Sequence, residues 1–401
     1  PIIIYSSLKD ERPSSFYALI LLMQFGLVGV FTSFDGLLFY IFWEVTLIPI
    51  WFICGLFGTG ENKQRVNLKF FIYTFFGSLF MLVALIYIYL QAGSFDLQAM
   101  YAAKLSSEAQ TFVFWMFFLA FAIKLPVFPF HTWQADTYTM APTQGSMLLA
   151  GIMLKMAVFG MIRYLLPLAP EAVTGTSGSI ALVLSVIGIV YASLIAVVQK
   201  DIKRLIAFSS MAHVGLISAG IFSSALVSAN CGLDVTGIEG ASIQMLAHGV
   251  NVVGLFYVAD ILIKRYGTRD LSKMGGLAAK APALAVLFMI ISLGTMAVPL
   301  TNAFIGEFLL LKSIFALSTW GAVIAGLTLI LCAVYVTKMY GMSMFGAGNK
   351  EFLEKQNDIC IGSKIGLGIL AVLVLVFGIY PQPLLSLSSE TAHQVLSLLA
   401  R

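Results

Sequence analysis

Six ionisable side chains lie in stretches of this sequence that are otherwise almost entirely apolar. They are two acids, two lysines and two histidines, namely Glu44, Lys124, Lys155, His213, His248 and Glu307. A charged side chain at the centre of a bilayer costs roughly 2.5–3.5 kcal/mol on insertion scales, so such residues usually have a partner or a function. Because all six side chains can exchange protons, the pattern predicts a path for protons or ions through a membrane.

The first carboxylate and the two lysines are the strongest candidates. Glu44 lies in FYIFWEVTLIPIWF, Lys124 in FFLAFAIKLPVFPF and Lys155 in MLLAGIMLKMAVFGMI. Unit charges about 7 Å apart at an effective dielectric constant of about 20 interact by roughly 2.4 kcal/mol. Moving one charge against about 100 mV needs about 2.3 kcal/mol. Because the two energies are similar, we expect removal of the attraction of Glu44 to make the proton of Lys124 labile near neutral pH and free to move to Lys155.

The two histidines have two interpretations. His213 in SSMAHVGLISAG and His248 in MLAHGVNVVGLF could be core residues that bond to serines or to the backbone. Alternatively, because histidine titrates near neutral pH, they relay protons between stronger acids and bases. Glu307, in NAFIGEFLLLK, follows a helix break and would be the last residue of such a relay. We expect all three in the path.

The composition excludes an ordinary soluble enzyme. Of the 401 residues, 60% are hydrophobic and 10% are charged, whereas a soluble domain has about 25% charged residues. The four cysteines lack the CxxC-like spacings of zinc sites and iron–sulfur clusters, and no glycine cluster forms a dinucleotide-binding fingerprint. We therefore expect no metal, cluster, disulfide or cofactor in this chain, and no nucleic-acid partner.

Runs of mostly apolar residues predict an all-α membrane protein. A helix needs about 20 such residues to cross a bilayer. Eleven spans of this kind lie near residues 14–35, 36–59, 68–91, 111–138, 143–166, 179–199, 202–222, 238–264, 281–311, 319–345 and 364–385.

The distribution of lysine and arginine supports this number of spans and orients them. If the chain alternates across the membrane, 17 of these residues fall on the side of the amino end, side A, and four on the opposite side, side B. Basic residues are in excess in cytoplasmic loops, so side A is the cytoplasm, the matrix or the stroma. The first 13 residues resemble a cytoplasmic loop that follows a missing apolar span.

Two predicted spans of about 30 residues are interrupted by proline. In the first, Pro126 follows Lys124, and in the second, Pro299 precedes Glu307. Proline removes an intrahelical hydrogen bond, which is tolerated at membrane depth where the freed groups face protein or water. The prolines could simply kink long tilted helices, but paired breaks that carry charges favour a transport site between inverted repeats. The expected division is a loop over 1–13, one five-helix repeat over 14–166, a second over 179–345, and a C-terminal span and tail over 364–401.

Six segments carry a resemblance to a known family. They are GLLFYIFWEVTLIPIWFICGLFG, AIKLPVFPFHTWQAD, APTQGSMLLAGIMLKMAVFGMIRYLLP, DIKRLIAFSSMAHVGLISAGI, MLAHGVNVVGLFYVADILIKR and NAFIGEFLLL. Together they resemble the antiporter-like, proton-pumping membrane subunits of respiratory complex I (NADH:quinone oxidoreductase), most specifically subunit M of bacteria, called chain 4 in mitochondria. The resemblance covers nearly the whole chain. Because that family has fourteen spans, it implies that this chain holds the last eleven.

The resemblance also implies roles and surroundings. It makes Glu44 the carboxylate that pairs with Lys124, and Glu307 the terminal carboxylate of the second half, with the other three candidates on a central polar axis. NADH, FMN, iron–sulfur clusters and quinone are then expected in partner subunits. The lipid bilayer and the other membrane subunits of complex I are the expected neighbours. The expected location is the bacterial inner membrane, with the mitochondrial inner membrane as the alternative.

One segment departs from the family pattern. The family often has a proline before the aspartate of the HxW segment and a histidine two residues after it, where this chain has Ala135 and Tyr138. A proton role for this loop is therefore in doubt, and we interpret its His131 and Asp136 as loop structure. Asp260, near a helix end on side A, is also left outside the path.

Two other classes of protein remain as alternatives. Subunits of multisubunit sodium/proton antiporters and of membrane-bound hydrogenases share this fold and have similar residues, without a link to NADH. A solute carrier with a central pocket is disfavoured, because the midplane groups are titratable rather than amides and hydroxyls suited to a small molecule. The WEVTLIPI and HTWQAD segments favour complex I.

Overall fold

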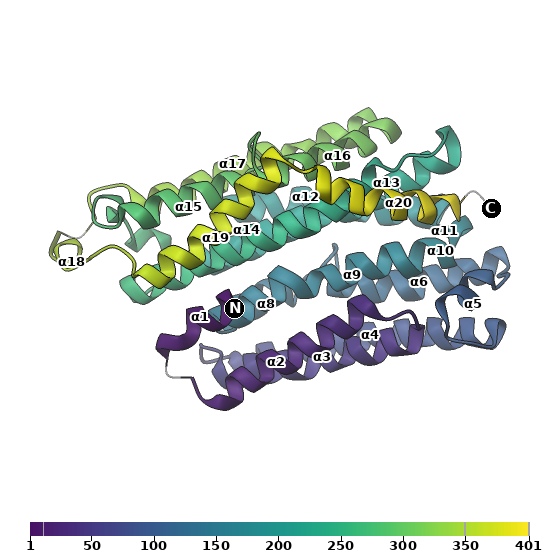
Figure 1. Cartoon of the computed structure of the whole chain (residues 1–401), viewed down its shortest axis with the longest axis horizontal. Helices are drawn as coiled ribbons and strands as arrows, with labels where there is room; N and C mark the ends of the chain where they lie inside the picture. The colour runs from purple at the N-terminus through teal and green to yellow at the C-terminus, as the bar shows by residue number, and fades with distance from the viewer. Residues whose placement is uncertain (11, 349, 400–401) are drawn as a thin grey trace.

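The computed structural model describes residues 1–10, 12–348 and 350–399. This part of the chain is mostly helical and has no β-strand apart from two isolated bridges. In Figure 1 the long helices run side by side along one direction, with α18 (Lys350–Glu354) at one end and α5 (Leu97–Ala102) and α11 (Pro170–Thr174) at the other. The all-α membrane fold expected from the sequence is confirmed.

Nine helices of the described residues are long and apolar enough to cross a bilayer. Eight are continuous: α2 (Ser14–Thr32), α3 (Gly36–Phe57), α4 (Lys63–Ala92), α12 (Thr176–Val198), α13 (Ile202–Cys231), α14 (Thr236–Tyr266), α17 (Thr319–Met344) and α19 (Ile361–Ile379). The ninth, Thr143–Leu168, consists of α8 (Thr143–Leu148), η2 (Leu149–Met153), α9 (Leu154–Gly160), η3 (Met161–Leu165) and α10 (Leu166–Leu168).

The two remaining predicted spans are each divided between two helices. They are α6 (Ser107–Lys124) with α7 (Gln134–Met140), and α15 (Pro282–Thr295) with α16 (Asn302–Leu317). The short elements are α1 (Ile2–Ser7), η1 (Leu8–Asp10), α5, α11, η4 (Leu271–Lys273), η5 (Leu277–Ala279), α18 and α20 (Gln382–Ser397). The last span ends earlier than the sequence suggested, at Ile379, because Pro381 interrupts the helix.

Both proline breaks place a charged residue close to a helix end inside the bundle. The first helix ends at Lys124, and the next helix of that span begins at Gln134. The second break lies between α15 and α16, where Ala297 and Leu300 have φ angles of 51° and 72°. These angles are uncommon for residues other than glycine. Consequently, Lys124 ends α6 and Glu307 lies in the second turn of α16.

The span 143–168 departs from regular α-helix on both sides of Lys155. The elements η2 and η3 are π-helical, and α9 lies between them. Single π-helical turns are rare and are frequent at functional sites. They rotate the residues between them relative to a regular helix, so the direction of Lys155 depends on this local widening.

One local structure occurs in both halves of the chain. Asp35, before α3, forms an antiparallel bridge with Asp96, before α5; Asp201, before α13, pairs in the same way with Asp270, before η4. All four side chains accept backbone N–H groups at the start of their helices. The recurrence supports the predicted duplication, whose bounds of 14–166 and 179–345 remain a prediction.

The helices differ in how far they are enclosed. The apolar part of α13 is completely buried inside the bundle, whereas α17 and α19 expose most of theirs. Figure 1 shows the helices of the first half, from α2 to α9, as one layer beside a second layer formed by α12 to α17. Helices in lipid are held together by close packing through small residues. Gly237 and Gly240 of α14 provide such contacts with α13 and α16.

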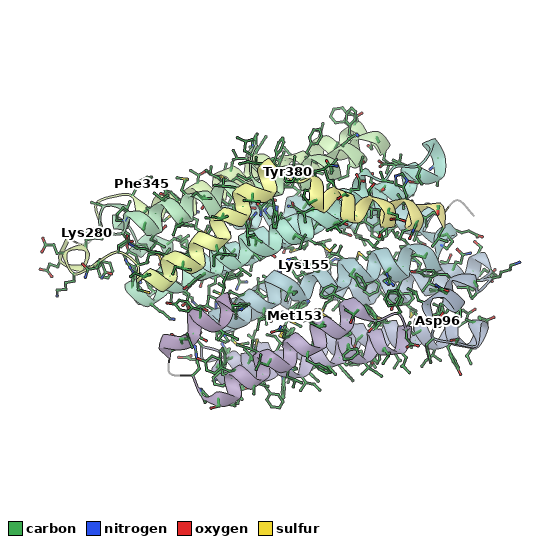
Figure 2. All side chains as sticks on the ribbon, viewed as in Figure 1. Asp96, Met153, Lys155, Lys280, Phe345 and Tyr380 are labelled. Carbon is green, nitrogen blue, oxygen red and sulfur yellow. The ribbon has the colours of Figure 1, made fainter. Side chains whose placement is uncertain are left out.

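The topology predicts that opposite ends of the bundle are reached from opposite sides of the membrane. Lys280 and Asp96 lie at the two ends in Figure 2. Single cysteines at the exposed residues Lys280 and Lys104, in a background without native cysteines, should react with an impermeant maleimide from side A and side B respectively. Labelling of both from one side would contradict the arrangement of the spans.

Candidate functional site

Four of the six candidate residues form two hydrogen-bonded pairs in the interior. Lys155 of α9 contacts His248 of α14, with 2.7 Å between Nζ and Nδ1. His213 of α13 contacts Glu307 of α16, with 2.8 Å between Nδ1 and Oε1. The two histidine rings lie 5.9 Å apart between their centroids. The structure therefore brings Lys155, His248, His213 and Glu307 into one row, which we call the central row.

Lys155 is positioned by the irregular helix around it. Its ammonium group donates a hydrogen bond of 2.7 Å to the carbonyl of Ala150, one of the residues of η2. A lysine ammonium only donates, so Nδ1 of His248 is the acceptor when Lys155 is charged. In this state His248 is neutral, its proton is on Nε2, and Nε2 has no hydrogen-bond partner among the described residues. Figure 2 places Lys155 near the middle of the bundle.

The pair His213–Glu307 is held by two further residues. Gln244 of α14 donates from Nε2 to the same oxygen of Glu307 at 2.9 Å. On the other side of the imidazole, Sγ of Cys332 lies 3.6 Å from Nε2 of His213. His213 and Glu307 are 3% and 2% exposed, so neither group is solvated by bulk water. A buried acid–base pair of this kind is strongly destabilised when one partner is removed.

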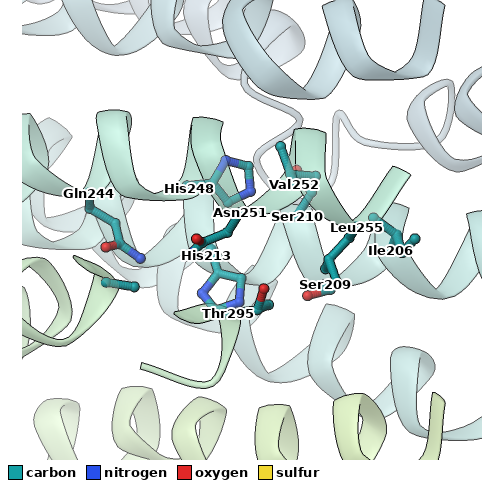
Figure 3. Close-up of a pocket in the computed structure, with 11 residues that line it drawn as sticks. Ile206, Ser209, Ser210, His213, Gln244, His248, Asn251, Val252, Leu255 and Thr295 are labelled. Atoms are coloured by element: carbon teal, nitrogen blue, oxygen red, sulfur yellow. The ribbon is translucent and has the colours of Figure 1, made fainter. Parts of the chain in front are cut away.

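A polar cavity lies against both histidines. His213, His248, Gln244, Asn251 and Ser210 line it (Figure 3), together with Ile206, Ser209, Val252, Leu255, Thr295 and Ala303. Four polar atoms at the cavity are buried without a hydrogen-bond partner among the residues that the structure describes: Oγ of Ser210, Oε1 of Gln244, Nε2 of His248 and Oδ1 of Asn251. The volume open to the centre of a water-sized sphere is ≈ 10 Å³, which is about the space of one water molecule. The cavity can therefore bridge the histidines through water.

Glu44 and Lys124 form a separate group in the first half. Nζ of Lys124 lies 5.4 Å from the ring centre of Trp43, a distance at which a cation is attracted to an aromatic face. Lys124 is 3% exposed and its ammonium has no hydrogen-bond partner among the described residues. No ion pair within 4.0 Å joins it to Glu44 in the described part of the chain, although the two groups interact electrostatically. The predicted pairing is thus electrostatic rather than a direct contact.

Aromatic side chains pack beside Lys124. The rings of Trp43 and Phe121 lie 5.8 Å apart, and Phe121 covers Gly160 so closely that a Cβ there would lie 2.5 Å from the ring. No hydrogen bond joins Lys124 to Lys155 within the described residues. Transfer between the two lysines therefore requires water or a side-chain movement in this region.

Several residues of the site were not selected from the sequence. Gln244 and Asn251 lie four residues before and three residues after His248, so they share its helix face. That spacing of amides in an apolar span is a signal that could have identified them. Cys332 contacts His213 from a distant span, and no local pattern indicates this contact.

The residues left outside the path lie apart from the central row. Asp136 is bonded to Arg204 at 2.9 Å and lies 3.6 Å from Lys69. His131 packs between the rings of Phe128 and Tyr191. Asp260 forms an ion pair of 2.7 Å with Lys264. These contacts fix loops and helix ends.

Comparison with known proteins agrees with this geometry. The family model described as NADH:quinone oxidoreductase/Mrp antiporter, TM, matches residues 33–332. The chain is 42% identical over 378 residues to NADH-quinone oxidoreductase subunit M of Rickettsia typhi, a match that covers 94% of this chain and 74% of that protein. It is 37% identical over 397 residues to NADH-ubiquinone oxidoreductase chain 4 of Chondrus crispus, with coverage of 99% and 78%.

A solved structure shows the same fold. A chain of respiratory complex I from Thermus thermophilus with bound NADH superposes with a TM-score of 0.90 at 32% identity, covering 99% of this chain and 82% of that one. The protein is therefore a multi-pass, antiporter-like membrane subunit. It belongs to the NADH:quinone oxidoreductase/Mrp antiporter transmembrane family.

Removing the carboxylate of the buried pair should destabilise the protein. Glu307→Leu leaves His213 and Gln244 without their shared acceptor and is expected to cost about 3–5 kcal/mol. Glu307→Gln keeps an acceptor and should cost less. The measurement is thermal unfolding of the purified complex, with Phe308→Leu on the exposed side of the same helix as control. Equal losses in Glu307→Leu and Phe308→Leu would contradict the paired arrangement.

Proposed function

We propose that this chain is the M-type membrane subunit of an NADH:quinone oxidoreductase, and that it moves protons between side A and side B of an inner membrane. The observation that carries the proposal is the central row, in which four titratable side chains from four helices form two hydrogen-bonded pairs whose histidine rings lie 5.9 Å apart. The relatives and the complex I structure support the assignment to this enzyme rather than to an unrelated carrier.

The six residues act in sequence. A change in the charge of Glu44 releases a proton from Lys124, whose ammonium has no hydrogen-bond partner within the described part of the chain to retain it. The proton reaches Lys155, which can donate directly to Nδ1 of His248 over 2.7 Å. His248 then gives up the proton on Nε2 to the cavity. From the cavity the proton reaches Glu307, whose carboxylate Gln244 and His213 hold in place.

Helix ends lie close to the charges at both limits of this sequence. Lys124 is the last residue of α6, where the helix dipole stabilises a cation. Glu307 lies in the second turn of α16, one turn beyond the helix end at the second break. Broken helices whose ends point at ions are a recurrent feature of transport sites. Both breaks thus place a helix end close to a charged residue of the path.

The electron-transfer chemistry belongs to partner subunits in this proposal. Among the described residues, no group of three or more His, Cys, Asp or Glu side chains is placed to hold a metal ion. The cysteines described in the structure, Cys54, Cys332 and Cys360, do not come together as the several cysteine ligands that an iron–sulfur cluster needs. NADH, FMN, the clusters and quinone are accordingly assigned to the other subunits of complex I. This chain contributes proton transfer and contacts with neighbouring membrane subunits and lipid.

A second candidate function is favoured by the family description. It includes Mrp antiporters, so a subunit of a sodium/proton antiporter remains the alternative. The two functions differ in the source of energy, because an antiporter works without NADH. Lost sodium tolerance with intact NADH-driven pumping in a variant of the central row would favour the antiporter.

Replacing Lys124 should abolish or strongly reduce proton pumping. Lys124→Ala removes the group that starts the transfer while leaving the redox sites of partner subunits untouched. The measurement is inhibitor-sensitive, NADH-driven pH change in membrane vesicles, normalised to complex content. Lys104→Ala, an exposed lysine in the same half, is the matched control and should pump normally.

Unchanged pumping in Lys124→Ala would contradict the path. Loss of pumping in Lys104→Ala as well would show that assembly, rather than proton transfer, had been disturbed.

A further inference from the structure

A polar cluster lies beyond Glu307, at the side-B end of α13, α14 and α16. The carboxylate of Asp234 accepts hydrogen bonds from Oγ of Ser313 at 2.7 Å and from the hydroxyl of Thr236 at 2.5 Å. The hydroxyl of Ser224 donates to the backbone carbonyl of Asp234, and Ser223 donates to the carbonyl of Ser313 at 2.8 Å. We call these residues (Asp234, Ser223, Ser224, Ser313 and Thr236) the outer cluster. Asp234 is partly exposed, whereas Ser223, Ser224 and Ser313 are buried.

Ser313 of the outer cluster lies on the same helix as Glu307. Ser313 follows Glu307 by six residues on α16, which corresponds to about 9 Å along the helix axis. This helix runs from the second break toward the side-B end of the bundle. A buried acid is therefore followed, less than two helical turns later, by hydroxyls that lead to a second carboxylate near the surface.

Leu310 lies between these two polar groups and is completely buried. Its side chain covers Gly220 of α13 so closely that a Cβ there would lie 2.2 Å from Cδ2 of Leu310. The backbone of α16 at Leu310 and Gly306 similarly covers Gly240 of α14, where a Cβ would lie 2.9 Å from the nitrogen of Leu310. The three helices α13, α14 and α16 thus pack closely around Leu310. Its apolar side chain lies between the buried carboxylate of Glu307 and the hydroxyl of Ser313, which are three residues away on either side along α16.

We propose that Leu310 is the closed gate of a release route that leads from Glu307 to side B through the outer cluster. The inference rests on the proposed function and names the residues of its last step. When α16 shifts at its break and Leu310 leaves the glycine junction, water enters between Glu307 and Ser313. Protonated Glu307 then gives its proton to this water and becomes a carboxylate. Asp234 accepts a proton from the same water chain and releases it to side B.

The gate gives the path a direction. While Leu310 is seated, Glu307 exchanges protons only with the central row, and the proton gradient cannot drive protons back from side B. The glycines at 220 and 240 permit the seal, because any side chain there would hold α16 away from α13 and α14. The small hydroxyls beyond it provide partners for water without adding a charge.

The gate is tested in inside-out membrane vesicles that carry the whole complex. Leu310→Ala opens a gap, and Leu310→Asn keeps the size of the side chain but makes it polar. Both variants should oxidise NADH at the normal rate, show a several-fold faster decay of the pH gradient after the substrate is exhausted, and pump fewer protons per NADH. Phe308→Ala, on the exposed face of the same helix, is the control and should behave as wild type.

The outer cluster is tested independently with Asp234→Asn. The amide keeps the size and most hydrogen bonds of the carboxylate but does not ionise, so pumping should fall while the gradient decays at the normal slow rate. Asp234→Glu should restore pumping. A gradient as tight as wild type in both Leu310 variants overturns the gate, and normal pumping in Asp234→Asn overturns the outer cluster. If either negative result is obtained while Lys124→Ala loses pumping, the proposed function stands and that part of the release route is rejected. Normal pumping in Lys124→Ala rejects both the proposed function and the release route.

Discussion

Charges at membrane depth have no bulk water around them, and the interior of this protein is organised by the need to compensate them. Lys155 has a carbonyl and an imidazole within 2.7 Å, and His213 and Glu307 have each other. Among the residues that the structure describes, Lys124 has an aromatic ring beside it but no hydrogen-bond acceptor for its ammonium. The group that is least compensated is the one expected to change its charge first.

This constraint also explains the irregular helices. Continuous α-helices would satisfy every backbone group but would offer the buried charges no polar ends. The breaks in the spans 111–138 and 281–311 provide these ends next to Lys124 and Glu307. The π-helical turns beside α9 free a carbonyl for Lys155. Local departures from regular structure are therefore concentrated where the charges are.

Much of the fold was predictable because bilayer thickness and charge asymmetry limit the arrangement of apolar segments. The eleven spans correspond to nine single spanning helices and two broken ones in the described residues. The predicted end of the last span was less accurate. The helix ends at Ile379 rather than near residue 385, because Pro381 interrupts it. The recurring bridges of Asp35 with Asp96 and of Asp201 with Asp270 are contacts between distant segments, which apolar patterning does not reveal.

The candidate residues were identified from the sequence because a charge in an apolar span is conspicuous, but their grouping was not. In the described residues Lys124 lies beside the ring of Trp43 and bonds to neither Glu44 nor Lys155, an arrangement that spacing alone does not determine. Ser210 and Cys332 are small and neutral, so they do not stand out in a membrane span. Their importance follows from position next to the histidines.

The central claim is that the two pairs of the central row communicate through water in the cavity between His213 and His248. A cryo-electron microscopy map of the assembled complex, at a resolution that shows ordered water, tests it most directly. The account predicts a water within hydrogen-bond distance of Nε2 of His248 and of Ser210 or Asn251. A dry cavity, with an apolar side chain between the two rings, would contradict it.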